Sequence, residues 1–233
     1  MASKSGPDII EDGLVLCLDA ASKRSYPGTG TVWTDLKSNK SGAMQNMTDN
    51  FSSENSGRLT FDGSNEYISF SNGEDIFPNN NIFSITFWQY IQGRNSSVFH
   101  LTGPSTSNEV WIMNSSTSFA FGDNLVFAVN ASPANDYWST GFVPPLNEWM
   151  NITFVKTSSN AYLYVDSALT ASTSYSRSIN LGSNMPFYIG TDPDPGGFSQ
   201  YMNGYISSLS VYNRALTADE IRRNYLSTKE RFA

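Results

Sequence analysis

The stretch "SVYNRALTADEIRRNY", Ser210–Tyr225, begins with the alternation of a strand, turns, and ends with the pattern of a helix. Thr217 and Glu220 form a capping box, in which the threonine hydroxyl can accept from the Glu220 amide and the glutamate side chain can accept from the Thr217 amide. Leu216 before the cap and Ile221 after it form a hydrophobic staple. This local pattern specifies the start of a helix.

The predicted helix covers residues 218–228 and carries a single apolar stripe. Tyr225 lies one turn beyond Ile221 on that stripe, and polar or charged residues occupy most other positions. A short helix with so narrow a stripe is marginal in water and must pack against other elements to be stable. Because the rest of the chain shows almost no helical pattern, we expect this helix to close a β fold.

Most of the chain consists of short runs in which apolar side chains alternate, bounded by Gly, Asn, Ser or Pro. In "GLVLCLDA", Leu14, Leu16 and Leu18 share one face. "FSITFWQYI" is apolar on both faces, which predicts a central strand. "LTFDGSNEYISF" predicts a hairpin that turns at Asp62 and Gly63. The runs together predict an all-β fold, a two-sheet antiparallel jelly-roll sandwich with a short C-terminal helix.

Later runs extend the same pattern. "EWMNITFVK" and "AYLYVD" are separated by a short polar stretch, which predicts a second hairpin. "GYISSLSVY" predicts the last strand, with Tyr205, Leu209 and Val211 on its inward side. Among the tryptophans, we expect Trp33, Trp88 and Trp149 to lie in the core. Trp111 points to the opposite face from its apolar neighbours along the strand. The sequence therefore leaves open whether its side chain lies in the core or at the surface.

The length of 233 residues suits one large sandwich domain. Residues 1–12 are polar and without periodicity, and we interpret them as an N-terminal arm that is flexible unless it docks. Residues 13–233, including the helix, then form the domain. The sequence has a single cysteine, Cys17, so no intrachain disulfide is possible. We expect Cys17 to be a small packed side chain.

The charge balance argues against two classes of partner. The chain has 14 basic and 21 acidic residues and a formal net charge of −7, without a cluster of Lys and Arg. Nucleic acid and anionic membranes both require a basic surface, so neither is expected as a partner. No apolar run approaches the length of a membrane span, and the first residues lack the apolar core of a secretory signal. We therefore expect synthesis in a reducing cytosol.

Several of these stretches, in this order, resemble the concanavalin A-like lectin/glucanase superfamily and, within it, the laminin G-like jelly-roll domains of bacterial and phage proteins. The matching stretches are "GLVLCLDA", "SYPGTGTVWTDL", "LTFDGSNEYISF", "FSITFWQY", "EWMNITFV", "AYLYVDSAL", "PFYIG" and "GYISSLSVYNRALTADEIRRNY". They extend from Gly13 to Tyr225. The resemblance implies a two-sheet antiparallel sandwich in which the first and last long strands lie side by side.

This fold carries lectins, adhesion modules, glycan-cleaving enzymes and structural domains, so function must be argued from a site. The short form "SYPGTGTVWTDL" resembles domains in virion proteins of tailed phages. That resemblance implies a nonenzymatic decoration or adhesion module in the virion, whose partners are phage capsid or tail proteins or a cell-surface glycan. The alternatives are a divergent glycan hydrolase and a purely structural homo-oligomer without a ligand.

The sequence argues against catalysis. Enzymes of this superfamily cleave glycans with carboxylates spaced as Glu-x-Asp-x-x-Glu on one strand, and this spacing is absent. His100 is the only histidine, and no Gly-x-Ser-x-Gly motif accompanies it. We expect His100 to be an ordinary strand residue. The protein is therefore predicted not to be an enzyme.

Two loops are candidate binding sites. "PANDYWSTGF" supplies amide, carboxylate and aromatic groups in a predicted loop, the combination that a sugar ring requires. The predicted carbohydrate-binding residues are Asn135, Asp136, Tyr137 and Trp138.

Calcium is the metal that the resemblance suggests, and it takes hard oxygen ligands. In "GTDPDPGGF", Asp192 and Asp194 alternate with prolines on a stiff loop, and they are the predicted metal ligands. The loop "DLKSNKSG", where related domains often carry a calcium ligand, keeps Asp35. It also contains two lysines that would oppose a divalent cation.

Overall fold

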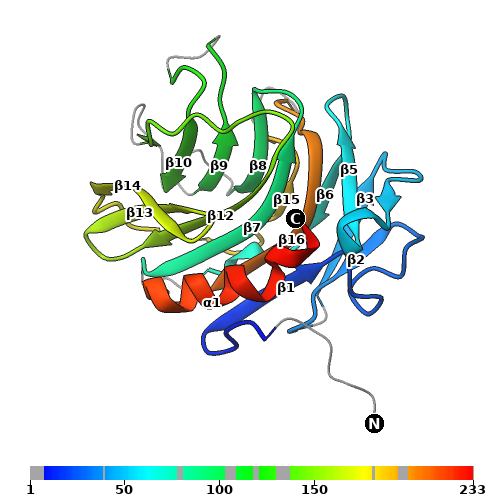
Figure 1. Cartoon of the computed structure of the whole chain (residues 1–233), viewed down its shortest axis with the longest axis horizontal. Helices are drawn as coiled ribbons and strands as arrows, with labels where there is room; N and C mark the ends of the chain where they lie inside the picture. Colours follow the sequence, from blue (N-terminus) through cyan, green and yellow to red (C-terminus); the bar gives the residue numbers. More distant parts are fainter. Residues whose placement is uncertain are drawn as a thin grey trace.

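The computed structural model of the chain describes residues 8–38, 40–77, 81–102, 109–117, 121–129, 137–179, 182–193 and 199–232. Two antiparallel sheets of eight strands each pack face to face (Figure 1). Sheet A has the order β14 (Ala168–Ser174), β13 (Asn160–Val165), β12 (Trp149–Lys156), β7 (Phe83–Ile91), β16 (Asn203–Tyr212), β5 (Arg58–Asp62), β4 (Phe51–Ser52), and β1 (Leu14–Asp19) also pairs with β16.

Sheet B has the order β11 (Tyr137–Ser139), β10 (Leu125–Val129), β9 (Val110–Asn114), β8 (Ser96–Leu101), β15 (Phe187–Ile189), β6 (Tyr67–Phe70), β3 (Ser41–Gln45), β2 (Val32–Thr34). The helical elements are α1 (Ala218–Thr228) and the short 3-10 turns η1 (Glu54–Ser56), η2 (Gly73–Asp75) and η3 (Lys229–Arg231). The predicted all-β sandwich with one short C-terminal helix is confirmed, and the helix has the predicted bounds.

The main core fills the space between the sheets with large apolar side chains. Phe127 of sheet B stacks on Phe154 of sheet A, with ring centroids 4.9 Å apart. One polar pair lies inside this core: Gln89 Nε2 donates to Asn114 Oδ1 at 3.3 Å, and Asn114 Nδ2 donates to Gln89 Oε1 at 3.1 Å. Both amides are fully buried, so this reciprocal pair is a specific link between the two sheets.

The first and last long strands lie side by side, as the resemblance implied. β1 and β5 share one edge of β16, and β7 pairs with the other edge. The register of β16 shifts between Ile206 and Ser208, which is a β-bulge. Leu209 and Val211 lie in the core as predicted, together with Ile206. The prediction for Tyr205 is wrong, because the extra residue inverts the alternation and leaves this side chain partly exposed on the outer face.

The predicted hairpin at Asp62 and Gly63 is also wrong. β5 belongs to sheet A and β6 to sheet B, so the chain crosses between the sheets here. Glu66 holds the crossing: its buried carboxylate accepts from the Asp62 amide at 2.6 Å and from Asn50 Nδ2 at 2.7 Å. Both strands still direct alternate apolar residues into the same core. Apolar residues that alternate with a period of two therefore cannot distinguish a hairpin within one sheet from a crossing between the two sheets.

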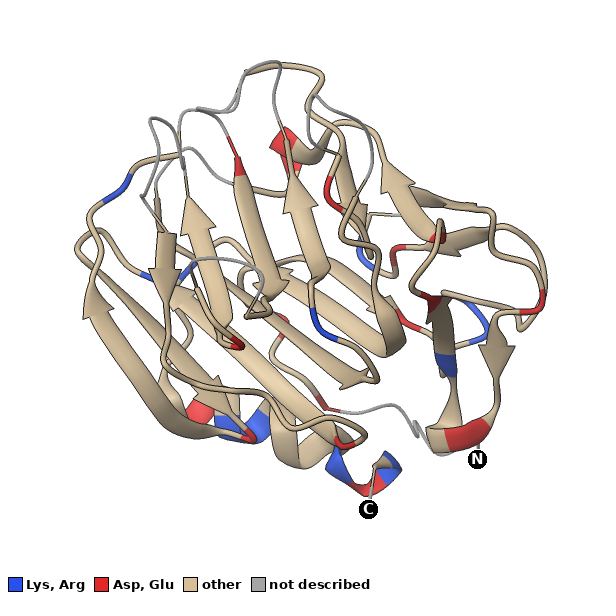
Figure 2. Cartoon of the chain, turned by 90° about the horizontal axis from the view of Figure 1, so that it is seen from above, with Lys and Arg blue, Asp and Glu red and all other residues tan. Residues whose placement is uncertain are grey.

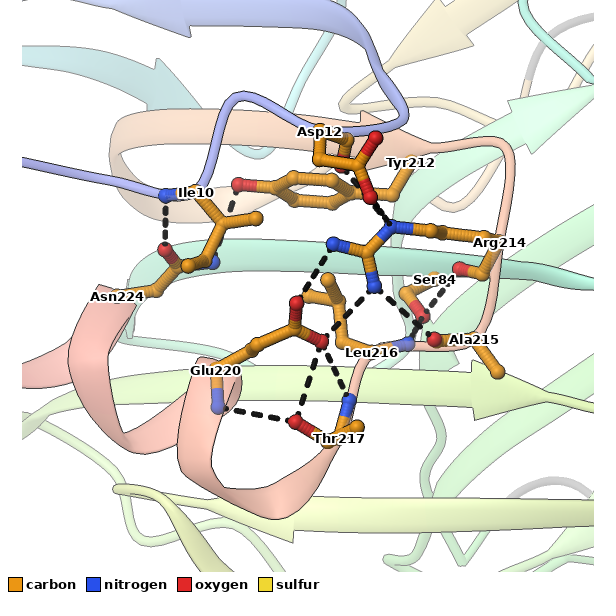
Figure 3. Close-up of polar contacts among 10 residues, drawn as sticks. All are labelled: Ile10, Asp12, Ser84, Tyr212, Arg214, Ala215, Leu216, Thr217, Glu220 and Asn224. Atoms are coloured by element: carbon orange, nitrogen blue, oxygen red, sulfur yellow. Dashed lines mark hydrogen bonds and ion pairs between the residues drawn. The ribbon is translucent and has the colours of Figure 1, made fainter.

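Helix α1 lies across the outer face of sheet A (Figure 1). Its capping box is formed: the Thr217 amide donates to Glu220 Oε2 at 2.8 Å, and the Glu220 amide donates to Thr217 Oγ1 at 3.3 Å. The Arg214 guanidinium donates to both Glu220 oxygens, at 2.8 and 2.7 Å (Figure 3). The Leu216 amide donates to Ser84 Oγ of β7 at 3.0 Å and ties the start of the helix to the sheet.

A second apolar cluster seals the helix to the sheet, and it contains Leu14, Val155, Tyr212, Leu216, Ile221. Residues 8–12, the N-terminal segment, dock beside this cluster (Figure 3). The Ile10 amide donates to Asn224 Oδ1 at 2.8 Å, and Asp12 pairs with Arg214 at 2.8 Å. The described part of the predicted arm is therefore docked on the helix and the end of β16.

The three tryptophans predicted for the core differ in position. Trp33 is fully buried in the main core, as predicted. Trp88 is buried, but it faces outward from β7 and lies beneath α1. Trp149 is partly exposed on the same outer face, so its prediction is wrong. The neighbouring residues Phe87 and Met150 occupy the inward positions, and alternation along each strand sends the tryptophans outward.

Candidate carbohydrate-binding cleft

A cleft of about 490 Å³ lies where the edge strand of sheet B, β11, approaches the end of the edge strand of sheet A, β14. It is lined by Tyr137, Trp138, Ser139, Thr173, Ser174, Tyr175, Ser176, Arg177. Its walls combine aromatic rings, aliphatic hydroxyl groups and one guanidinium group. A cleft of this composition can contact the apolar face of a small ligand and hydrogen-bond its polar groups.

Trp138 is not the exposed loop residue that the sequence predicted. It is the middle residue of β11, opposite Phe127, and only 9% of it is exposed. Its ring meets the edge of Phe154 with centroids 6.2 Å apart and an interplanar angle of 84°. Alternation along β11 turns this side chain into the main core, so that it forms part of the base of the cleft.

Tyr137 occupies the outward position of the same strand and remains partly exposed. Its ring contacts Phe121 edge to face, with centroids 4.1 Å apart. The other two predicted carbohydrate-binding residues, Asn135 and Asp136, lie outside the described residues. Of the four predicted residues, the structure thus brings Tyr137 and Trp138 to one cleft.

The opposite wall was not predicted from the sequence. The Tyr175 hydroxyl accepts from the Val129 amide at 3.0 Å and donates to the Val129 carbonyl at 3.3 Å, which fixes the segment after β14 against β10. Arg177, two residues further on, brings a cation to the cleft. β14 has the sequence "ALTASTS" and is mostly exposed, so it offers little apolar alternation by which a strand could be predicted.

The outer face of sheet B carries a row of side chains at matching register across five strands, namely Tyr137, Ala128, Trp111, His100, Tyr188. This row settles the place of Trp111, which faces outward and donates from Nε1 to Glu109 Oε1 at 3.3 Å. Trp111 also lies near Phe121, with centroids 6.4 Å apart. The row ends at Tyr137, so the cleft is continuous with the outer face of sheet B.

His100 lies in β8, which confirms that it is a strand residue, but it is also an ion-pairing centre. Its Nε2 is 3.3 Å from Glu109 Oε2, and its Nδ1 is 3.2 Å from Asp192 Oδ1. Burial alone would lower the pKa of His100, but the two carboxylates outweigh burial and raise the pKa to about 9. The imidazole is therefore charged at neutral pH.

Only one of the two predicted calcium ligands lies among the described residues. Asp192 faces His100, and Asp194 lies outside the described residues. Asp35, in the other loop, is fully buried and accepts from the amides of Cys17, Lys37 and Ser38 and from the Ser38 hydroxyl. Over the ranges that the structure covers, no three His, Cys, Asp or Glu side chains form a metal-binding group. Because Asp194 lies outside these ranges, the calcium site at Asp192 and Asp194 stays a prediction.

Charged residues are spread over the loops, strand ends and helix, and most strand residues are uncharged (Figure 2). Ion pairs use several of the basic residues, including Lys40 with Asp75 at 2.8 Å and Arg231 with Asp19 at 2.8 Å. In the described ranges, no helix is both long and apolar enough to cross a bilayer.

A two-layer antiparallel sandwich in which the first and last long strands pair is the fold that the sequence resemblance implied. The chain belongs to the concanavalin A-like lectin/glucanases superfamily, which it matches over residues 61–222. It is 30% identical over 176 residues to the non-toxic nonhemagglutinin type A of Clostridium botulinum. That match includes 73% of this chain and 14% of the relative, so the chain spans a small part of the relative's length.

Solved structures share the fold at low sequence identity. Domain 4 of the extracellular arabinanase AbnA from Geobacillus stearothermophilus, solved with arabinotriose, has a TM-score of 0.64 and 15% identity, with 93% of this chain and 100% of that chain covered. The receptor-binding domain of botulinum neurotoxin C/D mosaic serotype has a TM-score of 0.65 and 13% identity, with 93% and 52% covered. Trypanosoma rangeli sialidase has a TM-score of 0.62 and 18% identity, with 100% and 36% covered.

Proposed function

We propose that this protein is a nonenzymatic carbohydrate-binding module that binds a glycan in the cleft between β11 and β14. The observation that carries the proposal is the cleft itself, in which Tyr137 faces a wall of hydroxyl groups and Arg177 across the edge of a lectin-like sandwich. A sugar ring has an apolar face that suits an aromatic side chain and hydroxyl groups that require hydrogen-bond partners. The cleft offers both kinds of contact.

Two further points support this proposal. A domain of similar fold, AbnA domain 4, was solved with an arabinose oligosaccharide, and other fold neighbours are receptor-binding domains. The described residues that line the cleft include no Asp or Glu. Glycoside hydrolysis by the usual routes needs a pair of carboxylates on either side of the scissile bond. The cleft is therefore better suited to binding than to cleavage.

The test is the replacement of Tyr137 by Ala, followed by glycan-array retention of both proteins. We expect the variant to lose about tenfold or more in affinity for the glycan that retains the wild type, because the exposed aromatic contact is removed. Tyr67→Ala is the matched control, since Tyr67 is also a partly exposed tyrosine of sheet B but lies on β6, outside the cleft. Trp138 is unsuitable for this test, because its replacement would create a core cavity.

Equal retention of Tyr137→Ala and wild type would contradict the proposed cleft. Retention of neither protein on any glycan would contradict carbohydrate binding as a whole. In that case sedimentation analysis would show whether the chain is instead a structural oligomer. Release of reducing sugar from mixed polysaccharides by the wild type would favour the alternative of a divergent hydrolase.

The setting of the module is a separate proposal. We infer from the resemblance to tailed-phage domains that it decorates a virion or serves in its adhesion, with capsid or tail proteins as its anchors. Mass spectrometry of purified phage particles would test this proposal, and we expect the chain to co-purify with the particle in a fixed ratio to the major structural proteins. Absence of the chain from particles would contradict the virion setting without affecting glycan binding.

A further inference from the structure

A second pocket lies on the outer face of sheet A, at the C-terminal end of α1. Its volume is about 250 Å³. It is lined by Trp88, Trp149, Asp166, Tyr225, Lys229, Glu230, Phe232. It shares no lining residue with the cleft between β11 and β14. Four aromatic side chains and two carboxylates in so small a pocket are an unusual composition for a protein surface, where large aromatic groups are normally scattered.

The aromatic rings form one connected wall. Phe232 stacks on Trp88 with centroids 4.0 Å apart and lies 4.7 Å from Trp149. Tyr225 stacks on Trp88 at 5.7 Å. Trp88 is only 4% exposed, whereas the other three rings are partly exposed and give the pocket its accessible aromatic surface.

The indole N–H groups have partners within the protein. Trp88 Nε1 donates to Thr228 Oγ1 at 2.9 Å, and Trp149 Nε1 donates to Asn55 Oδ1 at 3.1 Å. These bonds fix the orientation of both rings from their edges. A ligand in the pocket therefore meets the ring surfaces of the tryptophans, whose faces carry partial negative charge, rather than their indole N–H groups.

The carboxylate of Asp166 gives the pocket a negative charge. Asp166 lies in the turn between β13 and β14, is exposed, and accepts from the Asn151 amide at 2.9 Å. Burial raises the pKa of Asp166, and the hydrogen bond from Asn151 opposes this effect. Among the described residues, no basic side chain pairs with Asp166, while Lys229 lies 3.7 Å from Glu230. A carboxylate without a basic partner, next to aromatic faces, attracts a cation.

We propose that this pocket binds a small alkylated ammonium cation, such as a choline-type headgroup. The methyl groups of such a cation pack on Trp149, Tyr225 and Phe232, and its charge is attracted by the ring faces and by Asp166. An alkylated ammonium ion gives up hydration more readily than a lysine ammonium group or a metal ion, which suits a pocket whose wall is largely aromatic. The pocket is too small for a drug-sized ligand but suits one headgroup.

Choline chloride is the probe, and the indole Nε1–H signals in nitrogen–proton NMR spectra of the full chain are the readout. We expect saturable shifts of the Trp88 and Trp149 signals and no shift of the Trp33 signal, which reports the buried core. The uncharged isostere 3,3-dimethylbutan-1-ol should bind about tenfold more weakly, because it has the same shape without the charge.

Asp166→Asn is the decisive variant, because an asparagine can keep the left-handed backbone of this turn and still accept from the Asn151 amide. We expect its affinity for choline to fall about fivefold or more. Asp49→Asn is the matched control, since Asp49 also has positive φ but lies outside the pocket. The proposal is overturned by an absence of shifts up to about 50 mM choline. Equal binding of the isostere, or equal binding by both variants, would overturn it as well.

Discussion

At the scale of single residues, His100 is a buried titrating group held between two carboxylates. Glu109 precedes β9 and Asp192 follows β15, so three segments that are distant in sequence meet at one imidazole. Burial opposes its charge, but the two carboxylates raise its pKa to about 9. In the unfolded chain the same group has a pKa near 6.5. Folding therefore depends on the protonation of His100.

Because folding raises the pKa of His100, the protonated imidazole stabilises the folded state. The stabilising contribution of His100 is complete below pH about 6.5 and is lost as the pH rises through about 9. We expect the free energy of unfolding of wild type relative to His100→Gln to fall by about 1 to 3 kcal/mol over this range. Urea unfolding of both proteins at intervals between these pH values measures the difference. A constant difference would contradict the prediction.

The comparison with His100→Gln is necessary because Lys156 acts in the opposite direction. Lys156 is fully buried, and burial lowers its pKa to about 8. The folded state therefore gains stability relative to the unfolded state as the pH rises above about 8 towards 10.5. This effect is present in both proteins and cancels in their difference, provided that the substitution leaves the surroundings of Lys156 unchanged.

At the scale of elements, helix α1 depends on a network at its first turn. Glu220 accepts from the Thr217 amide and from both terminal nitrogens of Arg214. The side-chain hydrogen bonds from Arg214 lower the pKa of Glu220 to about 2, against the opposing effect of burial. This carboxylate therefore stays charged, and supports the helix, down to strongly acidic pH.

Thr217→Ala should lower the free energy of unfolding by about 1 kcal/mol, because the Glu220 amide loses its partner at the N-terminus. Thr170→Ala is a suitable control, since Thr170 is exposed and its hydroxyl donates only to the nearby Ala168 carbonyl. Urea denaturation measures both variants. Similar losses for the two substitutions would show that the cap contributes nothing specific.

This helix was predictable because its start is encoded by neighbours in sequence. The crossing from β5 to β6 was not, since Leu59 and Phe61 alternate in the same way whether the next strand belongs to the same sheet or to the other. Tyr205 was assigned to the wrong face because a bulge leaves no local signature in the sequence. Alternation predicts which residues share a face, but strand partners are set by contacts distant in sequence.

The candidate cleft, too, could be predicted from the sequence only in part. Tyr137 and Trp138 were predicted as a pair from residue type alone, but only the strand geometry separates the outward tyrosine from the inward tryptophan. Arg177 and Tyr175 reach the cleft from a polar segment without periodicity. Their positions depend on the bond between Tyr175 and Val129, which links residues 46 positions apart. No pattern along the chain indicates such a contact.

At the scale of the whole molecule, the two sheets are joined by apolar packing and by the buried pair of Gln89 and Asn114. Replacing one partner leaves the other amide without its hydrogen bonds in a site closed to water. Gln89→Leu should therefore cost about 2 to 3 kcal/mol of unfolding free energy. A chemical denaturation curve measures this loss.

The pair can be separated from simple packing by a double-mutant cycle. We expect Gln89→Leu with Asn114→Leu to be destabilised by at least about 1 kcal/mol less than the sum of the single variants, since the second substitution removes the unpaired amide. Strict additivity would mean that the two amides do not stabilise each other. It would also remove the reason to regard them as a link between the sheets.

The pairing of β1 with β16 determines how the molecule responds to mechanical load. The strands are antiparallel and Leu14 lies opposite Tyr212, so a pull on both chain ends acts on the same end of the pair. The backbone hydrogen bonds between these two strands then break one after another instead of resisting together in shear. If the module holds a particle to a surface, its resistance to force rests on the N-terminal segment and α1, which must detach before the first of these hydrogen bonds can break.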